Sequence, residues 1–209
     1  MLRRTFLFAS VFLAMLVACG SDTRHQAVPA GQTVLAFGDS VTFGTGASAG
    51  EDWPTLLATA TGWLVINAGV VGDTAQAAQA RLPALLVQHR PALVIIEIGG
   101  NDFLRRRSVA DVKADVRGLI QTAQASGAQV VLVAVPALSL MAAVAGRPSD
   151  APLYAELAKE VQVALVPDVF SAVLGDADLR ADPIHPNAAG YQKMAQGLHQ
   201  RLKALGIAP

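Results

Sequence analysis

The sequence has one cysteine, Cys19, so no disulfide bond can form within the chain. It has no excess of charge either: 16 basic and 16 acidic residues cancel, and no basic stripe favours nucleic acid as a partner. Only 15% of the residues are charged and 53% are hydrophobic, which argues against disorder. No cluster of His, Cys, Asp and Glu has metal-ligand spacing, and we expect neither a metal ion nor a cofactor. The 209 residues suit one domain with a small appendage.

At the N-terminus, Arg3-Arg4 precede an uncharged run at residues 5–18. This run is too short to span a membrane, and with its basic start it predicts a signal peptide over residues 1–18. Its end, Leu16-Val17-Ala18-Cys19-Gly20, resembles a bacterial lipobox. Such a motif makes Cys19 the first mature residue and the carrier of lipid. The alternative is an ordinary secretory signal that contains a cysteine by chance.

The predicted organisation is therefore a signal peptide (1–18), a flexible linker (19–32) and a folded domain (33–209). The linker is polar and lacks apolar periodicity. We expect a membrane-anchored lipoprotein outside the cytoplasm, in the periplasm or at the outer membrane. The oligomeric state and the leaflet that holds the anchor remain open.

Short runs rich in β-branched residues alternate with amphipathic segments through the rest of the chain. Strands are predicted at residues 34–37, 64–67, 93–98, 130–135 and 163–166, the last at a sheet edge. Helices are predicted at residues 53–61, 74–89 with a kink at Pro83, 108–126, 154–160 and 187–205. This alternation predicts an α/β fold, a three-layer α/β/α sandwich around a parallel sheet of about five strands.

Four short loops carry residues suited to nucleophilic acyl transfer. Ser40 follows the first strand, Gly72 the second and Asn101 the third, so these three residues should meet at the carboxyl edge of the sheet. His185 is the candidate base for the Ser40 hydroxyl, and Asp182, three residues earlier, can orient its imidazole. The backbone N–H groups of Ser40 and Gly72 and the amide of Asn101 are candidate oxyanion donors.

These loops read Gly38-Asp39-Ser40, Gly72, Gly99-Gly100-Asn101-Asp102 and Asp182-Pro183-Ile184-His185. Together they resemble the blocks of the GDSL/SGNH hydrolases, over roughly residues 33–205. Ala80-Arg81-Leu82-Pro83 and its neighbours are most similar to the bacterial periplasmic arylesterase/thioesterase/lysophospholipase branch. The resemblance implies a flavodoxin-like SGNH fold, no metal, and hydrolysis of esters or thioesters of acyl chains. The apolar segment 136–150 departs from the pattern of that branch, which leaves the substrate preference open.

The sequence leaves two alternatives to this predicted function. A carbohydrate O-deacetylase of the same fold is the nearest, although the apolar residues 136–146 favour acyl chains over sugars. A non-catalytic envelope lipoprotein that uses the fold for binding is the alternative from another class.

The cluster Arg105-Arg106-Arg107 is either a solvated surface or a contact for an anionic substrate or headgroup. Residues 44–49 match a dinucleotide fingerprint, but they come too late after the strand and lack an acidic ribose partner.

Overall fold

The computed structural model describes residues 25–137 and 148–209 of the chain. The predicted signal peptide, the predicted lipid attachment site Cys19 and residues 138–147 of the apolar segment lie outside the described residues.

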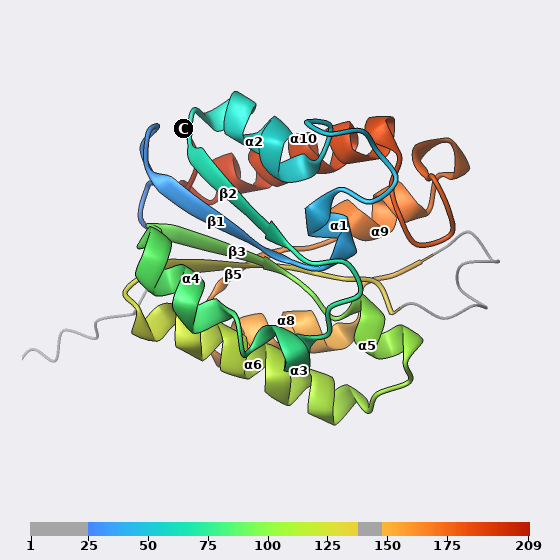
Figure 1. The fold of residues 1–209 in the computed structure, drawn as a ribbon, viewed down its shortest axis with the longest axis horizontal. Coiled ribbons are helices and arrows are strands. Elements are labelled where there is room, and N and C mark those ends of the chain that lie inside the picture. Colours follow the sequence, from blue (N-terminus) through green and yellow to red (C-terminus); the bar gives the residue numbers. More distant parts are fainter. Residues whose placement is uncertain (1–24, 138–147) are drawn as a thin grey trace, which may run out of the picture.

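Five parallel strands form one sheet, in the order β2-β1-β3-β4-β5. Their bounds are β1 (Thr33–Gly38), β2 (Leu64–Gly69), β3 (Leu93–Glu97), β4 (Gln129–Val133) and β5 (Ala164–Val166). Helices cover both faces of this sheet, with α2, α9 and α10 on one side and α3, α4, α6 and α8 on the other (Figure 1). The predicted three-layer α/β/α architecture is therefore confirmed.

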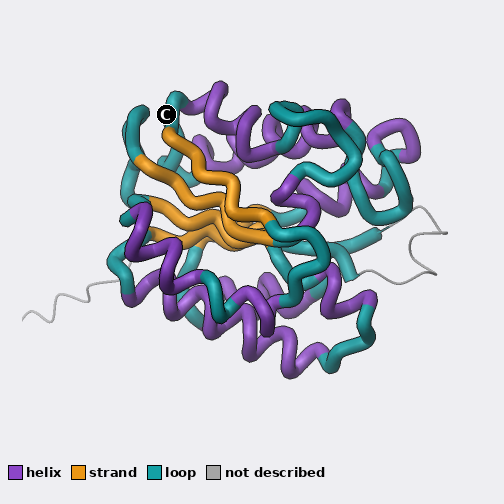
Figure 2. Tube along the Cα trace, viewed as in Figure 1, coloured by secondary structure: helices purple, strands orange, loops and turns teal. Residues whose placement is uncertain are grey.

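Figure 2 draws the five strands in orange between the helices, and burial along the strands follows their place in this sheet. Every residue of the central strand β3 is buried, which explains the apolar run of its first four residues. The three-residue β5 lies at one edge, as predicted, and β2 lies at the other. No residue of the edge strand β2 is fully buried, and Leu64 is 59% exposed.

The described helices are α1 (Ser40–Phe43), α2 (Trp53–Thr61), α3 (Ala75–Ala78), α4 (Leu82–His89), α5 (Gly100–Leu104), α6 (Val109–Ala125), α8 (Pro152–Glu160), α9 (Val169–Leu174) and α10 (Ala188–Ala204), with a 3₁₀ turn η1 (Ala177–Leu179). The longest two begin at side-chain caps. Ser108 accepts a hydrogen bond from the backbone N–H of Asp111, and Asn187 accepts one from that of Gly190.

The predicted helix 74–89 is two helices, α3 and α4, separated by a turn. Pro83 lies in the first turn of α4, where the missing N–H costs nothing, rather than in a helix interior. The short helices α1, α5 and α9 escaped prediction because four to six residues are too few to show a helical period.

The core extends to the start of the described chain. Trp63 is buried, and its indole N–H donates to the carbonyl of Val28, whose own N–H donates to Ile207. Val28 therefore packs on the folded body, although it lies within the predicted linker 19–32. Among residues 25–137 and 148–209, no helix is both long and apolar enough to cross a membrane.

Candidate active site

Ser40 is held at a strand-to-helix turn. β1 ends at Gly38, and Asp39 caps α1 by accepting a hydrogen bond of 3.1 Å from the backbone N–H of Val41. Ser40 is then the first residue of α1 and is only 6% exposed. Figure 1 shows α1 and α5 at the same edge of the sheet. Ser40 lines a cleft there together with residues of α5.

The loop before α10 presents His185 to this serine. Ser40 Oγ lies 3.0 Å from His185 Nε2, and His185 Nδ1 lies 2.7 Å from Asp182 Oδ2. The other oxygen of Asp182 accepts the backbone N–H groups of Ile184 and His185, each at 2.8 Å. The Asp182 carboxylate therefore stabilises the turn from Asp182 to His185 and also contacts the imidazole of His185. The structure brings together the three residues that the sequence singles out.

The surroundings of Asp182 favour its ionised form. Partial burial acts to raise the pKa of this carboxyl, but the hydrogen bonds from His185 and from the Ile184 backbone outweigh it and hold the pKa below its usual range. An ionised Asp182 accepts the Nδ1–H of the imidazole, which leaves Nε2 free to accept a proton.

Gly46 belongs to the motif that suggested a dinucleotide fingerprint, and the structure gives it a different role. A Cβ at this position would overlap the carbonyl oxygen of Pro186 and approach the side chains of Ala181 and His185. Glycine here lets the segment after α1 lie directly against the histidine loop. The motif is thus explained by packing beside the candidate site.

Asn101 and Gly72, the two candidate oxyanion donors outside the Ser40 turn, have different surroundings. Asn101 lines the same cleft as Ser40 and His185, and its Nδ2 donates to the carbonyl of Asp73 at 3.0 Å and to Asp39 Oδ2 at 3.3 Å. Gly72 has a positive φ of 77°, which by itself favours glycine. Its carbonyl accepts a hydrogen bond from Arg105, so the Gly72 loop is tied to α5.

Two buried carboxyls, those of Asp39 and Glu97, lie beside Ser40. Burial raises the pKa of Asp39 to about 7. Glu97, at the end of β3, is fully buried, and burial raises its pKa well above the usual range, with further help from the charge of Asp39. Thr42 donates to Glu97 Oε2 at 2.8 Å, while Oε1 has no partner among the described residues. The only sign of Glu97 in the sequence is that an acidic residue follows the apolar run 93–96.

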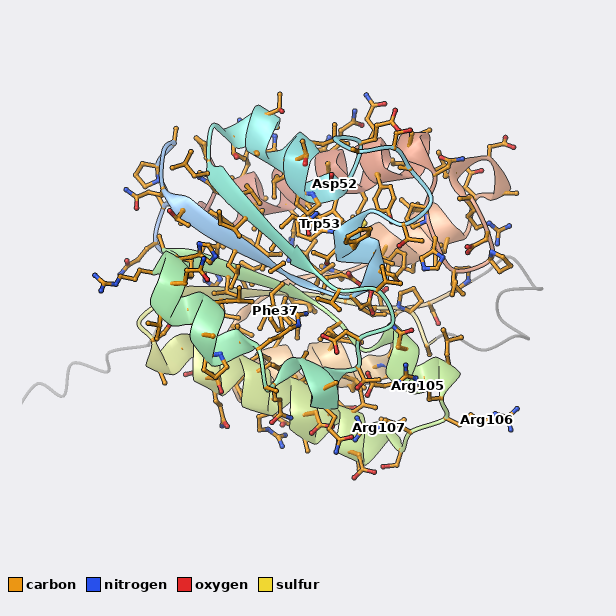
Figure 3. All side chains as sticks on the ribbon, in the orientation of Figure 1. Phe37, Asp52, Trp53, Arg105, Arg106 and Arg107 are labelled. Atoms are coloured by element: carbon orange, nitrogen blue, oxygen red, sulfur yellow. The ribbon has the colours of Figure 1, made fainter. Side chains whose placement is uncertain are left out.

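Arg81 lies near Ser40, because its guanidinium donates to the carbonyl of Gly38. In the sequence analysis it is named only as part of the family resemblance. Its guanidinium contacts the ends of two strands and Asp73. Within the arginine cluster, Arg107 pairs with Asp102 and Asp115, whereas Arg106 is exposed and points away from the body of the protein (Figure 3). The cluster is thus only partly a solvated surface.

The cleft at Ser40 is lined mainly by uncharged side chains. Beside Ser40, His185 and Asn101 it is bounded by Val41, Leu104, Phe170 and Ile184. Over the part of the chain that the structure describes, no group of three or more His, Cys, Asp or Glu residues could hold a metal ion. The contact of His185 with the Ser40 hydroxyl thus lies beside apolar side chains.

Comparison with known proteins places this fold and site in a family. Residues 36–193 match the GDSL-like Lipase/Acylhydrolase family, and the chain belongs to it. The chain is 35% identical over 190 residues to "Esterase TesA" of Pseudomonas aeruginosa, covering 84% of this chain and 90% of that protein. It is 36% identical over 183 residues to "Thioesterase 1/protease 1/lysophospholipase L1" of Escherichia coli, covering 84% and 86%.

Solved structures agree. A crystal structure of TesA superposes with a TM-score of 0.72 at 34% identity, covering 83% of this chain and 99% of that one. The esterase EstA from a Pseudoalteromonas species, inhibited by monoethylphosphonate, superposes with a TM-score of 0.71 at 26% identity, covering 83% and 97%. The protein is thus an SGNH-type hydrolase of the esterase/thioesterase kind, as the sequence predicts.

Proposed function

We propose that this protein hydrolyses carboxylic esters or thioesters of acyl chains, with Ser40 as nucleophile, His185 as general base and Asp182 as the group that orients the base. The observation that carries the proposal is the continuous pair of contacts from Ser40 Oγ to His185 Nε2, at 3.0 Å, and from His185 Nδ1 to Asp182 Oδ2, at 2.7 Å. Both distances lie within the reach that proton transfer requires.

The first half of the reaction forms an acyl-enzyme. Ser40 Oγ attacks the carbonyl carbon while its proton passes to His185 Nε2, and the carbonyl oxygen takes up negative charge. When the tetrahedral intermediate collapses, the bond to the leaving oxygen or sulfur breaks, and the imidazolium gives its proton to that atom. Asp182 stabilises the imidazolium between these two events.

The second half restores the enzyme. A water molecule gives its proton to His185 and attacks the acyl carbon, and the bond to Ser40 Oγ breaks as that oxygen regains the proton. The products are a carboxylic acid and the free serine. No metal or cofactor takes part in either half.

The proposed oxyanion donors are the backbone N–H groups of Ser40 and Gly72 and the side-chain amide of Asn101. The Asn101 amide already donates to Asp73 and, at a longer 3.3 Å, to Asp39. We expect the developing oxyanion to replace the longer of these bonds. One such donor contributes about 3–4 kcal/mol to lowering the barrier.

The apolar surroundings of Ser40 support acyl groups as substrate. Val41, Leu104, Phe170 and Ile184 bound the cleft. A sugar would need polar partners in place of these side chains. No observation favours the O-deacetylase, and an intact nucleophile, base and orienting acid disfavours a purely binding role.

The proposed location is outside the cytoplasm, with a lipid at Cys19 holding the domain to a membrane. This part of the proposal depends on the sequence of residues 1–20. It adds no step to the reaction, but it would bring the cleft close to lipid substrates.

The test is Ser40→Ala, assayed on p-nitrophenyl esters from acetate to palmitate beside an acyl thioester and a lysophospholipid. We expect less than about 1% of the wild-type kcat, since loss of a nucleophile can cost on the order of 10⁶. An organophosphonate should label the wild type stoichiometrically at Ser40 and leave the variant unlabelled. A folded variant that keeps its activity would remove Ser40 from the reaction.

A further inference from the structure

Arg81 joins the ends of the first two strands of the sheet. It immediately precedes α4, and its Nη2 donates to the carbonyl of Gly38 while Nη1 donates to that of Ala68, each at 2.7 Å. Gly38 is the last residue of β1, and Asp39 and Ser40 follow it directly. Ala68 is next to last in β2, which leads into the Gly72 loop. One guanidinium thus fixes the exits of both strands that lead to proposed oxyanion donors.

A third contact extends this connection to Asn101. Arg81 Nε donates to Asp73 Oδ2 at 2.8 Å, in an ion pair in which the Asp73 side chain is only 9% exposed. The backbone carbonyl of the same Asp73 accepts the side-chain amide of Asn101 at 3.0 Å. Arg81 therefore reaches Asn101 through one residue.

The arginine is itself held in one orientation. Its guanidinium carbon lies 3.9 Å from the centre of the Phe37 ring, which stacks beneath it. Three differently directed acceptors and a flat ring match the planar fork of a guanidinium. A lysine ammonium carries its charge at one point and does not reach three acceptors in this geometry.

We propose that Arg81 is a positioning residue for the oxyanion site: it sets the Gly72–Asp73 loop and, through Asp73, the Asn101 amide relative to Ser40. The inference rests on the proposed function of the Ser40 site. Arg81 touches no reacting atom, so its effect should appear in the chemical step and not in substrate binding.

The experiment compares Arg81→Lys and Arg81→Ala with Arg117→Ala, whose arginine pairs with Glu160 on the α6–α8 side, outside the cleft. We measure kcat and KM on a p-nitrophenyl ester, the rate of organophosphonate labelling, and the melting temperature of each variant. Assays run well below every melting temperature, so that unfolding does not contribute.

Removal of one oxyanion donor lowers kcat by about 10²–10³-fold. A misplaced donor should therefore lower kcat by roughly 10–100-fold and change KM by less than about threefold. Phosphonate labelling should slow in parallel, since it passes through a similar charged intermediate. Arg81→Lys should not restore kcat, and millimolar methylguanidinium should partly rescue Arg81→Ala but not Ser40→Ala. Arg117→Ala should keep the wild-type kcat.

Wild-type kcat in both Arg81 variants, or a loss confined to KM, would overturn the inference. So would a kcat loss that disappears on cooling, because it would reflect stability alone. If Arg81→Ala fails to fold, Asp73→Ala removes the acceptor of Arg81 Nε and keeps the backbone carbonyl that accepts the Asn101 amide; it should show a kcat loss of the same kind, and a normal kcat there would equally reject the proposal. If instead Ser40→Ala stays active, the proposed function fails, whatever the Arg81 variants do.

Discussion

At the scale of single residues, the proposed reactivity of Ser40 depends on partners from three separate segments. Asp39 holds the turn, His185 faces the hydroxyl from the loop before α10, and Asn101 reaches the cleft from α5. The carboxyls of Asp39 and Glu97, which also line this cleft, are almost fully buried. The proposed chemistry therefore depends on partly buried polar contacts to the serine and on its buried acidic neighbours.

Ser40 and His185 act in the same step of the proposed mechanism, so their losses should not multiply. We expect His185→Ala to lower kcat about as much as Ser40→Ala, by on the order of 10⁴–10⁶, and the double variant to be little worse than either. Asp182→Asn should cost less, because Asp182 orients the base and transfers no proton. Single-turnover rates with a p-nitrophenyl ester measure all four variants. Fully multiplicative losses would show that the two residues do not share a step.

Glu97 should make stability fall as pH rises. Burial raises its pKa well above the usual range, and that of Asp39 to about 7, so the unfolded chain loses these protons at lower pH than the folded chain does. The stabilisation is complete below pH of about 4 and is lost as pH rises through the folded-state values. Glu97→Gln keeps an acceptor for Thr42 and should remove the part of this loss of stability that comes from ionisation of Glu97.

Melting temperatures from pH 5 to pH 8 provide the measurement. The wild type should decline over this range more steeply than Glu97→Gln. The matched control is Glu156→Gln, an exposed glutamate that pairs with Lys113 on the surface and should follow the wild type. Equal slopes for wild type and Glu97→Gln would mean that Glu97 ionises freely in the folded protein.

At the scale of elements, the caps of the two longest helices have different neighbours. Ser108 caps α6 on the surface, remote from the cleft. Asn187 caps α10 directly after the histidine loop, and its side-chain amide also donates to the carbonyl of Asp178 at 2.8 Å. The same local motif therefore stabilises a helix in one place and a helix together with an active-site loop in the other.

We expect Ser108→Ala and Asn187→Ala to destabilise the fold by about 1 kcal/mol each, the usual effect of losing an N-cap. Only Asn187→Ala should also reduce kcat, by roughly 3–10-fold, because Asp182 and His185 lose a fixed attachment to α10. Denaturant titrations and ester assays on both variants separate the two effects. An equal kcat in the two variants would indicate that the histidine loop is held without Asn187.

At the scale of the whole molecule, the described domain and the first twenty residues have separate tasks. The fold, the cleft and the proposed catalytic residues all lie within residues 25–137 and 148–209, where no membrane-spanning helix occurs. The lipobox-like sequence at Cys19 is the proposed site of attachment to a membrane.

We predict that the wild-type protein fractionates with membranes, with a lipid-modified Cys19 as its first mature residue, and that Cys19→Ser is released in soluble, fully active form. Several acyl chains on one residue anchor stably, whereas a single chain binds only marginally. Cell fractionation and intact-mass analysis provide the measurements, with Ser21→Ala as a neighbouring control. Retention of Cys19→Ser in the membrane fraction would favour a different anchor.

The sequence by itself determined the strands, the long helices and the order of the reactive residues. Strand runs and the extents of the long helices α6 and α10 are encoded in neighbouring residues and can be read locally. Ser40, Asp182 and His185 were also identifiable, because their chemistry depends on residue type and because strand ends gather at one edge of a parallel sheet.

Only the tertiary structure decided the contacts that join distant segments. The exposure of β2 depends on its edge position, and the division of residues 74–89 into α3 and α4 accompanies their packing on α6. The burial of Glu97, the competing partners of Asn101 and the three contacts of Arg81 likewise involve residues far apart in the chain. Local periodicity carries no information about such partners, since they meet only when the sheet and both helix layers have assembled.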